Sequence, residues 1–152
     1  MPKIVVSVAR QEMDLLSNRG KLIATYPIST SKYGLGTELG SNKTPLGKFR
    51  VAEKFGAGAL WGTIFSARQG IGLWSPAFET DNDLITTRIL WLDGLEKHNA
   101  NTHDRYIYIH GTNHEELLGQ PASHGCIRMA NWHIVELFDQ VETGTSVVIK
   151  ES

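Results

Sequence analysis

The feature that most constrains this chain is a strand-like segment joined by a glycine-containing loop to the only cysteine. Tyr106, Tyr108 and His110 alternate with two isoleucines, which is the period of a β-strand and puts the tyrosines and the histidine on one face. Residues 111–125 contain three glycines and a proline, a composition typical of a compact loop. We therefore predict that the loop brings Cys126 back beside the strand that it left, which sets the thiol next to the His110 imidazole.

This pairing suits a nucleophilic cysteine. An unperturbed thiol has a pKa of about 8.5 and is only slightly ionised at neutral pH, so a neighbouring imidazole is needed to take its proton. Gly125 leaves the backbone open before Cys126, and the amides of Gly125 and Cys126 are predicted to form an oxyanion hole. A lone cysteine is more often a small buried residue, and a histidine at a strand end more often a structural polar group. The pair alone leaves both interpretations open.

The surrounding motif favours catalysis. It reads His-Gly-Thr-Asn at 110–113 and Ser-His-Gly-Cys-Ile-Arg-Met at 123–129. Together these strings resemble the signature of the L,D-transpeptidase (YkuD) family, bacterial enzymes that act on peptidoglycan stem peptides. Nearly the whole chain shares the resemblance, in the segments 4–8, 20–23, 26–30, 43–49 and 144–149.

The resemblance implies a role for each matched residue. Cys126 would be the nucleophile and His110 the general base, while the backbone carbonyl of Gly111 would accept a hydrogen bond. His124 would be a further site residue. Many family members have asparagine at the position of Arg128, and Ile-Arg-Met marks a subgroup in which that departure is common.

Three more residues are expected to contact the substrate, namely Arg128, Ser123 and Tyr108. A guanidinium can hold a carboxylate with two hydrogen bonds, so Arg128 is a candidate for binding the acidic stem peptide. An arginine here could equally pin the loop to backbone carbonyls, and the sequence leaves both roles open.

The remaining patterns predict a mainly β domain over residues 1–152 with one main α-helix. A first strand is expected at 4–8, a hairpin turn at 18–21 and a partner strand at 22–28. Asn131 is predicted to cap the helix. The resemblance implies a sandwich of mixed sheets with the site at its edge. Further strands are expected at 49–53, 85–92 and 147–149.

Two segments keep more than one interpretation. Residues 29–42 are rich in glycine, serine and threonine, and either overhang the site or form a surface loop. Residues 54–83 scatter glycines among aromatic side chains, which line a substrate groove or belong to the core.

Charge and hydropathy exclude several partners. Fifteen basic residues against sixteen acidic ones give a net charge of −1, so no basic field attracts nucleic acid or an anionic membrane. No apolar run approaches the ~20 residues of a membrane helix, and no cofactor is expected. The apolar stretch at 4–9 is too short for a signal peptide. We therefore expect a cytoplasmic protein, with a periplasmic one whose leader was removed as the alternative.

The resemblance implies that Cys126 attacks the carbonyl of the L-configured third residue of a stem peptide and releases D-alanine. A cytoplasmic location favours water as the acceptor, which would make the chain an L,D-carboxypeptidase that trims muropeptides for recycling. The alternative is a periplasmic L,D-transpeptidase that uses an amine acceptor and forms cross-links. The resemblance also implies covalent inhibition by carbapenem-type β-lactams.

Two other classes of function compete with acyl transfer. In a zinc hydrolase, His110 and His114 would be ligands beside Glu115, but Gly111 and the strand pattern remove the helical spacing that such a pair needs. A binding module that holds cell-wall peptides without reacting would leave Cys126 dispensable.

Overall fold

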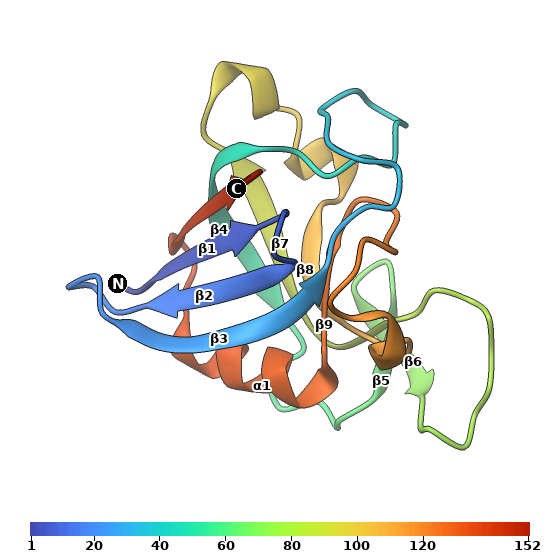
Figure 1. Cartoon of the computed structure of the whole chain (residues 1–152). Coiled ribbons are helices and arrows are strands. Elements are labelled where there is room, and N and C mark those ends of the chain that lie inside the picture. The colour runs from blue at the N-terminus through green and yellow to red at the C-terminus, as the bar shows by residue number, and fades with distance from the viewer.

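The computed structural model describes residues 1–152 and contains ten strands in one mixed sheet, three short 3₁₀ helices and one α-helix (Figure 1). The strands are β1 (Lys3–Ser7), β2 (Glu12–Leu16), β3 (Leu22–Ser29), β4 (Gly47–Phe55), β5 (Thr63–Ser66), β6 (Gln69–Leu73), β7 (Ile85–Gly94), β8 (Tyr108–Thr112), β9 (Ile127–Met129) and β10 (Ser146–Lys150). The helices are η1 (Lys97–Asn99), η2 (His103–Arg105), η3 (Glu115–Leu117) and α1 (Asn131–Gln140).

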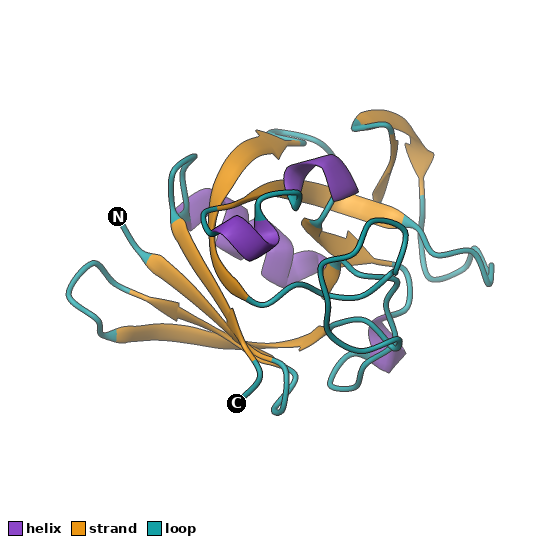
Figure 2. Ribbon diagram, turned by 90° about the horizontal axis from the view of Figure 1, so that it is seen from above, coloured by secondary structure: helices purple, strands orange, loops and turns teal.

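The sheet curls back on itself. Its strand order is β4-β10-β1-β2-β3-β9-β8-β7-β5-β6, and β4 also pairs with β7. Because β4 pairs with β7, the run of strands from β4 to β7 in this order closes into a ring. The β5–β6 hairpin extends outward from β7 (Figure 2). Only β1–β10 and β8–β9 are parallel pairs. The predicted mainly β fold with mixed strand directions and one main helix is confirmed, and its layers are parts of one continuous sheet.

Alternating apolar residues explain why these strands form a core. Ile4 and Val6 of β1, and Met13 and Leu15 of β2, are fully buried, while the residues between them are less buried or exposed. The main core holds 20 buried residues, including Ile134 and others from the apolar face of α1. Burying a side chain of this size contributes about 1.5–3 kcal/mol.

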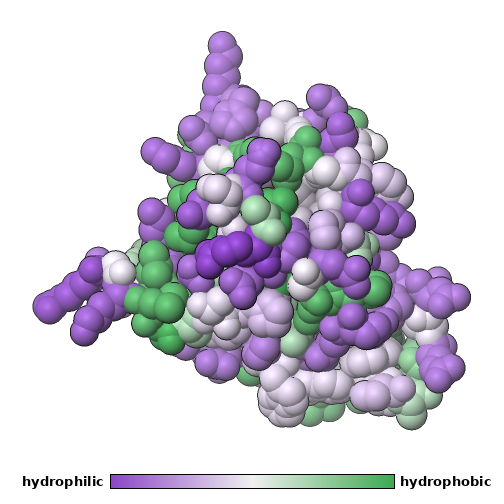
Figure 3. Space-filling view, in the orientation of Figure 1, coloured by the Kyte–Doolittle hydropathy of each residue, from purple (hydrophilic) through white to green (hydrophobic).

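Outside the core, the face seen in Figure 3 is largely hydrophilic, with apolar side chains in separate patches. No helix of the structure combines the length and the apolar character needed to cross a membrane.

The first strand pairing differs from the expected one. The segment 22–28 does not pair with β1, because a strand that the sequence analysis missed, β2, lies between them. Gln11 adopts φ +50° in a tight turn, which reverses the chain directly after β1. The turn at 18–21 therefore joins β2 to β3.

Asn131 does not cap α1 with its side chain. Ala130 occupies the N-cap position without a side-chain hydrogen bond, and Asn131 is the first helical residue. The Asn131 side chain is fully buried, where its oxygen accepts hydrogen bonds from the hydroxyls of Thr86 and Thr87 and its nitrogen donates to the Thr112 carbonyl. The amide thus serves buried polar groups of β7 and β8 rather than the helix end.

We predict that Asn131→Ala lowers the free energy of unfolding by about 2–4 kcal/mol, because it leaves two buried hydroxyls and a carbonyl without their partner. Urea unfolding at pH 7 measures the change. The matched control is Asn18→Ala in the exposed turn, which should stay within about 0.5 kcal/mol of wild type. Equal values for the two variants would contradict the bonding role of Asn131.

Candidate active site

The parallel pairing of β8 with β9 brings the two halves of the motif together. Ile109 lies opposite Ile127, and His110 lies opposite Arg128. The two faces expected for the strand are also present, since Ile109 belongs to the main core and Tyr108 to a second cluster of buried residues.

Cys126 lies beside the beginning of β8 and not beside its end. Its sulfur accepts a hydrogen bond from the Tyr108 amide at 3.3 Å and donates one to the Tyr106 carbonyl at 3.3 Å. Because β9 runs parallel to β8, the loop must return to the start of β8 before the pairing begins. No hydrogen bond joins the thiol to the His110 imidazole in this arrangement, and the pairing of the two groups stays a prediction.

The Cys126 thiol rests in an apolar environment. It packs against the second cluster, which is made of Phe65, Ile89, Trp91 and Tyr108. Although the residue is only partly buried, burial of the sulfur raises the pKa of Cys126 to about 11. The resting thiol is accordingly protonated at neutral pH, so its reaction requires a base.

His110 is suited to be that base. Its side chain is buried, and Nδ1 lies 2.5 Å from the Gly111 carbonyl oxygen. Nδ1 therefore carries the proton and donates it to that carbonyl, which leaves Nε2 as an acceptor. Burial lowers the pKa of His110, although the Gly111 hydrogen bond and the charge of Asp83 oppose this effect. The imidazole is neutral at pH 7 and able to accept a proton.

Gly111 occupies a point where β7 approaches closely. A Cβ atom at this position would lie 2.5 Å from the Thr86 carbonyl oxygen and 2.8 Å from Asn131 Oδ1. Both neighbours are held in the buried network described above, so neither can yield easily. The absence of a side chain at Gly111 thus allows the strand to place His110.

The turn that carries the cysteine is held by hydroxyl groups. Gly125 adopts φ +124°, which favours glycine, and its amide donates to Ser123 Oγ at 3.2 Å. The Ser123 hydroxyl donates to the Cys126 carbonyl at 2.6 Å. Thr44, which the sequence analysis did not single out, is fully buried and donates to the Gly125 carbonyl at 2.9 Å.

These bonds refine two expectations. Ser123 is buried in the turn and holds the backbone there, so the expected contact with substrate is not supported. Of the two expected oxyanion donors, the Cys126 amide has no hydrogen-bond partner within the chain, whereas the Gly125 amide already donates to Ser123.

An acidic residue that the sequence analysis missed links the remaining site residues. The Asp83 carboxylate accepts a hydrogen bond from Arg128 at 2.8 Å and lies 3.2 Å from His124 Nδ1. Burial alone would raise the pKa of Asp83, but the Arg128 hydrogen bond and nearby positive charge outweigh burial and lower it. Asp83 comes from the segment 54–83, whose local sequence carries no signal for it.

Arg128 thus pairs with Asp83 and makes no hydrogen bond to a backbone carbonyl, while it also lines a pocket of about 330 Å³. Its expected contact with substrate stays a prediction. Its side chain is 3% exposed and its carboxylate partner belongs to this chain. A buried guanidinium needs an acidic partner. The arginine between Ile127 and Met129 is therefore the one sequence signal that could have indicated a nearby acid.

A cavity of about 250 Å³ opens beside the nucleophile. It is lined by Cys126, His124, Tyr106 and Arg105, and by three residues of the segment 39–42. Arg105 donates to the Lys43 carbonyl at 2.6 Å and to the Gly36 carbonyl at 3.2 Å. The loop 29–42 consequently overhangs the site, which decides between the two interpretations left open for it.

Tyr108 contributes mainly through its backbone. Its ring is buried, and its hydroxyl accepts a hydrogen bond from Arg68 at 3.1 Å. The Tyr108 amide also donates to the Cys126 sulfur, and the expected contact of Tyr108 with substrate stays a prediction.

The family model for the YkuD L,D-transpeptidase catalytic domain matches residues 2–149. The chain belongs to this family. A stretch of 50 residues is 48% identical to the putative L,D-transpeptidase YqjB of Bacillus subtilis (strain 168), covering 33% of this chain and 28% of that protein. A stretch of 41 residues is 49% identical to the putative L,D-transpeptidase YkuD of the same organism, covering 27% of this chain and 25% of that protein. The matched stretches span less than a third of either relative.

Solved structures share the fold over the full chain. An L,D-transpeptidase from Xylanimonas cellulosilytica matches with a TM-score of 0.64 at 18% identity, covering 98% of this chain and 60% of that one. L,D-transpeptidase 3 from Mycobacterium tuberculosis, in complex with a faropenem-derived adduct, matches with a TM-score of 0.62 at 17% identity, covering 99% of this chain and 61% of that one. This chain thus has the fold of these L,D-transpeptidase structures.

We predict that Asp83→Asn lowers the free energy of unfolding at pH 7 by about 2–3 kcal/mol, because it leaves the buried Arg128 charge unpaired. The pKa of Asp83 is lowered in the folded state, so its contribution is present above the unfolded value of about 3.9 and is lost as pH falls through the folded value. Urea unfolding from pH 7 down to pH 3 should show the two proteins converging.

The matched control is Asp93→Asn. Its carboxylate has an exposure similar to that of Asp83 but pairs with Arg50, whose side chain is 52% exposed. An exposed pair of this kind contributes under about 1 kcal/mol. A similar loss in both variants, or a difference between wild type and Asp83→Asn that does not change with pH, would contradict the role given to Asp83.

Proposed function

We propose that this chain transfers acyl groups from peptidoglycan stem peptides through a thioester on Cys126. The observation that carries the proposal is the placement of the single thiol on the wall of a cavity, in the family's fold and near a neutral histidine whose Nδ1 is fixed by Gly111. The acyl donor is a peptide whose third residue has an L-centre and whose last residue is D-alanine.

The reaction begins when the thiol proton passes to Nε2 of His110 and the sulfur attacks the carbonyl carbon of the third residue. At rest the thiol donates to the Tyr106 carbonyl, so the Cys126 side chain must rotate towards His110 or a water must lie between them. The free Cys126 amide then donates to the oxyanion. When the intermediate collapses, the C–N bond breaks, the leaving amine takes the proton from His110, and a thioester remains.

We propose water as the acceptor, which makes the chain an L,D-carboxypeptidase acting on soluble muropeptides in the cytoplasm. His110 removes a proton from the water, the resulting hydroxide attacks the thioester, and the thiol is released with its proton restored. Hydrolysis is supported because it requires only the base, the thioester and a water, whereas cross-linking also requires a bound acceptor amine.

A specific feature favours a second candidate, an amine acceptor that would form cross-links. A second pocket of about 330 Å³ shares His124 with the first, and its charged lining residues are Asp81, Asp83, Glu116, Lys32 and Arg128. Carboxylates near this entrance would attract the ammonium group of an acceptor side chain.

We also propose that carbapenem-type β-lactams acylate Cys126. Two similar structures are complexes with imipenem and with a faropenem-derived adduct. Such compounds would provide a probe of the nucleophile that does not depend on knowing the exact stem peptide.

Acylation should depend on Cys126 and on His110. Intact-mass analysis after exposure to a tetrapeptide or to imipenem should show an adduct on wild type and none on Cys126→Ala. Because a general base contributes about 10²- to 10⁴-fold in rate, His110→Ala should slow acylation by that factor. The lowered pKa of His110 predicts that the wild-type rate persists as pH falls through about 6.5 and declines only below it.

His124→Ala is the comparison variant for this experiment. It removes a partly exposed imidazole that lines the cavity and bonds to Asp83, and should cost less than His110→Ala. An adduct on Cys126→Ala would refute the assignment of Cys126 as the nucleophile. If His124→Ala were inactive and His110→Ala nearly normal, the roles assigned to the two histidines would have to be exchanged.

The acceptor can be tested with one donor and two mixtures. The purified protein is incubated with a disaccharide-tetrapeptide, first alone and then with an excess of an acceptor carrying a free side-chain amine. Mass spectrometry should find the tripeptide as the main product of both mixtures. Dimers as the main product of the second mixture would establish the cross-linking activity instead.

A further inference from the structure

Arg68 is held in an unusual place at the tip of the β5–β6 hairpin. Ser66 pairs with Gln69, so Ala67 and Arg68 form a two-residue turn with φ +48° and +64°. Turns of this kind match the twist of a hairpin but normally use asparagine and glycine, because other residues are strained at positive φ. Contacts of the side chain must therefore help to hold Arg68 in this conformation.

The Arg68 guanidinium lies against aromatic rings. Its central carbon is 4.7 Å from the centre of the Trp91 ring and 5.7 Å from that of Tyr106. One nitrogen donates to the Tyr108 hydroxyl at 3.1 Å. The rings fix the plane of the guanidinium, while that single bond uses only one of its five N–H groups.

The residues that hold this guanidinium also hold the nucleophile. The Tyr108 amide donates to the Cys126 sulfur, and the Tyr106 carbonyl accepts from it. Cys126 also packs against the cluster that contains Trp91 and Tyr108. Arg68 is thus next to the residues that frame the thiol, although it comes from a hairpin at the far end of the sheet order.

The other two arginines around the site are already engaged. Arg128 is buried and paired with Asp83. Arg105 donates to the loop that overhangs the cavity, at Gly36, Ser41 and Lys43. Arg68 forms no ion pair with any carboxylate of the chain, and apart from the bond to Tyr108 its N–H groups have no partner within the chain.

We propose that Arg68 binds a carboxylate of the acyl donor and determines the preference of the enzyme for acidic stem peptides. The inference rests on the proposed function and takes over the role that the sequence had suggested for Arg128. Two carboxylates have the required chemistry. One is the terminal carboxylate of the leaving residue, next to the attacked carbonyl, and the other is a side-chain carboxylate on the third residue. A guanidinium with free N–H groups can hold either with two parallel hydrogen bonds.

The test compares Arg68→Ala and Arg68→Lys with wild type on three synthetic tetrapeptides. One peptide has both carboxylates, one has a C-terminal amide, and one has an amide in place of the side-chain carboxylate. Loss of a charge-assisted bidentate contact should lower kcat/KM of Arg68→Ala by about tenfold to a hundredfold on the fully acidic peptide. On the peptide that lacks the recognised carboxylate, wild type and Arg68→Ala should be equal, which identifies the source. Arg68→Lys should recover part of the rate.

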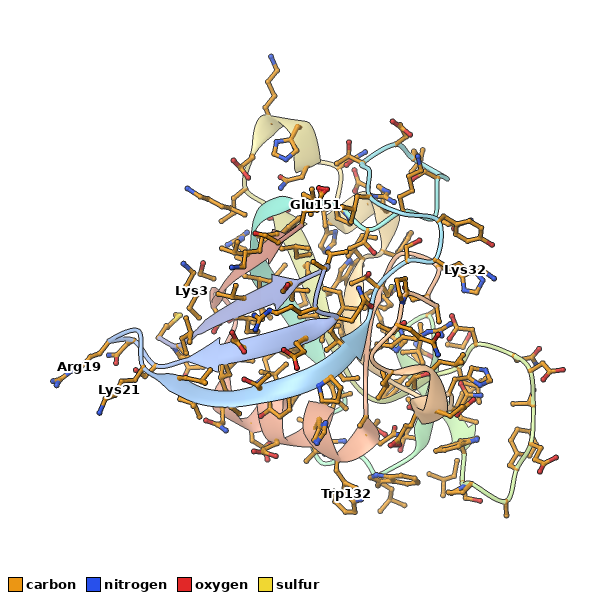
Figure 4. All side chains as sticks on the ribbon, viewed as in Figure 1. Lys3, Arg19, Lys21, Lys32, Trp132 and Glu151 are labelled. Carbon is orange, nitrogen blue, oxygen red and sulfur yellow. The ribbon has the colours of Figure 1, made fainter.

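The control variant is Arg19→Ala, in the exposed turn between β2 and β3 (Figure 4), which should behave as wild type on all three peptides. Alkylation of Cys126 by iodoacetamide, a neutral reagent, should proceed equally in wild type and the Arg68 variants. Equal losses on all three peptides, with slower alkylation or a lowered melting temperature, would overturn the proposal in favour of a structural role.

A binding experiment separates this inference from the proposed function. Calorimetry with Cys126→Ala, with and without Arg68→Ala, measures affinity for the same peptides without any reaction. If wild type forms no acyl adduct but the acidic peptide still binds better in an Arg68-dependent way, the proposed function fails and the role of Arg68 stands. If no peptide binds, or binding is independent of Arg68, the role of Arg68 is refuted.

Discussion

The parallel pairing of β8 with β9 is the constraint on which the site depends. A parallel pair cannot be closed by a tight turn, so the chain must travel back along the strand before it can pair. The compact loop 113–126 makes this return, and it delivers Cys126 to the start of β8 while His110 stays in the middle of the strand. The thiol is consequently held by the backbone of Tyr106 and Tyr108.

Burial determines the electrostatic state of the site at rest. Burial keeps the thiol protonated and the imidazole neutral, so neither reacting group carries a charge before substrate enters. The charges that are present, on Asp83 and Arg128, neutralise each other in a buried pair. In the proposed acylation, charge would first separate when the thiol proton moves to His110, and the free Cys126 amide would then donate to the developing oxyanion.

Several structural devices hold these groups in place, and they come from distant parts of the chain. Thr44 bonds to the carbonyl of Gly125 from before β4, Asn131 bonds to β7 and β8 from the start of α1, and Asp83 reaches Arg128 from the segment before β7.

Asn131 also shows that the hydrogen-bonding needs of buried groups can override a local preference for helix capping. An asparagine at a helix start is a good cap, yet here its amide satisfies buried hydroxyls, whose loss of a partner would cost more than an uncapped helix end.

The motif in the sequence predicted Cys126, His110 and Gly111 as site residues, because cysteine, histidine and glycine have chemical or steric properties that few other residues can supply. It also determined the alternation of β8 and the mainly β character of the fold. The tertiary structure decided which atoms meet. The register of the parallel pair β8–β9 places the thiol next to Tyr108. The buried Arg128 forms its ion pair with Asp83 of this chain. A turn at positive φ, 58 residues before the cysteine in the chain, brought Arg68 to the same aromatic cluster. Such contacts depend on long-range pairing and desolvation, which local composition does not encode.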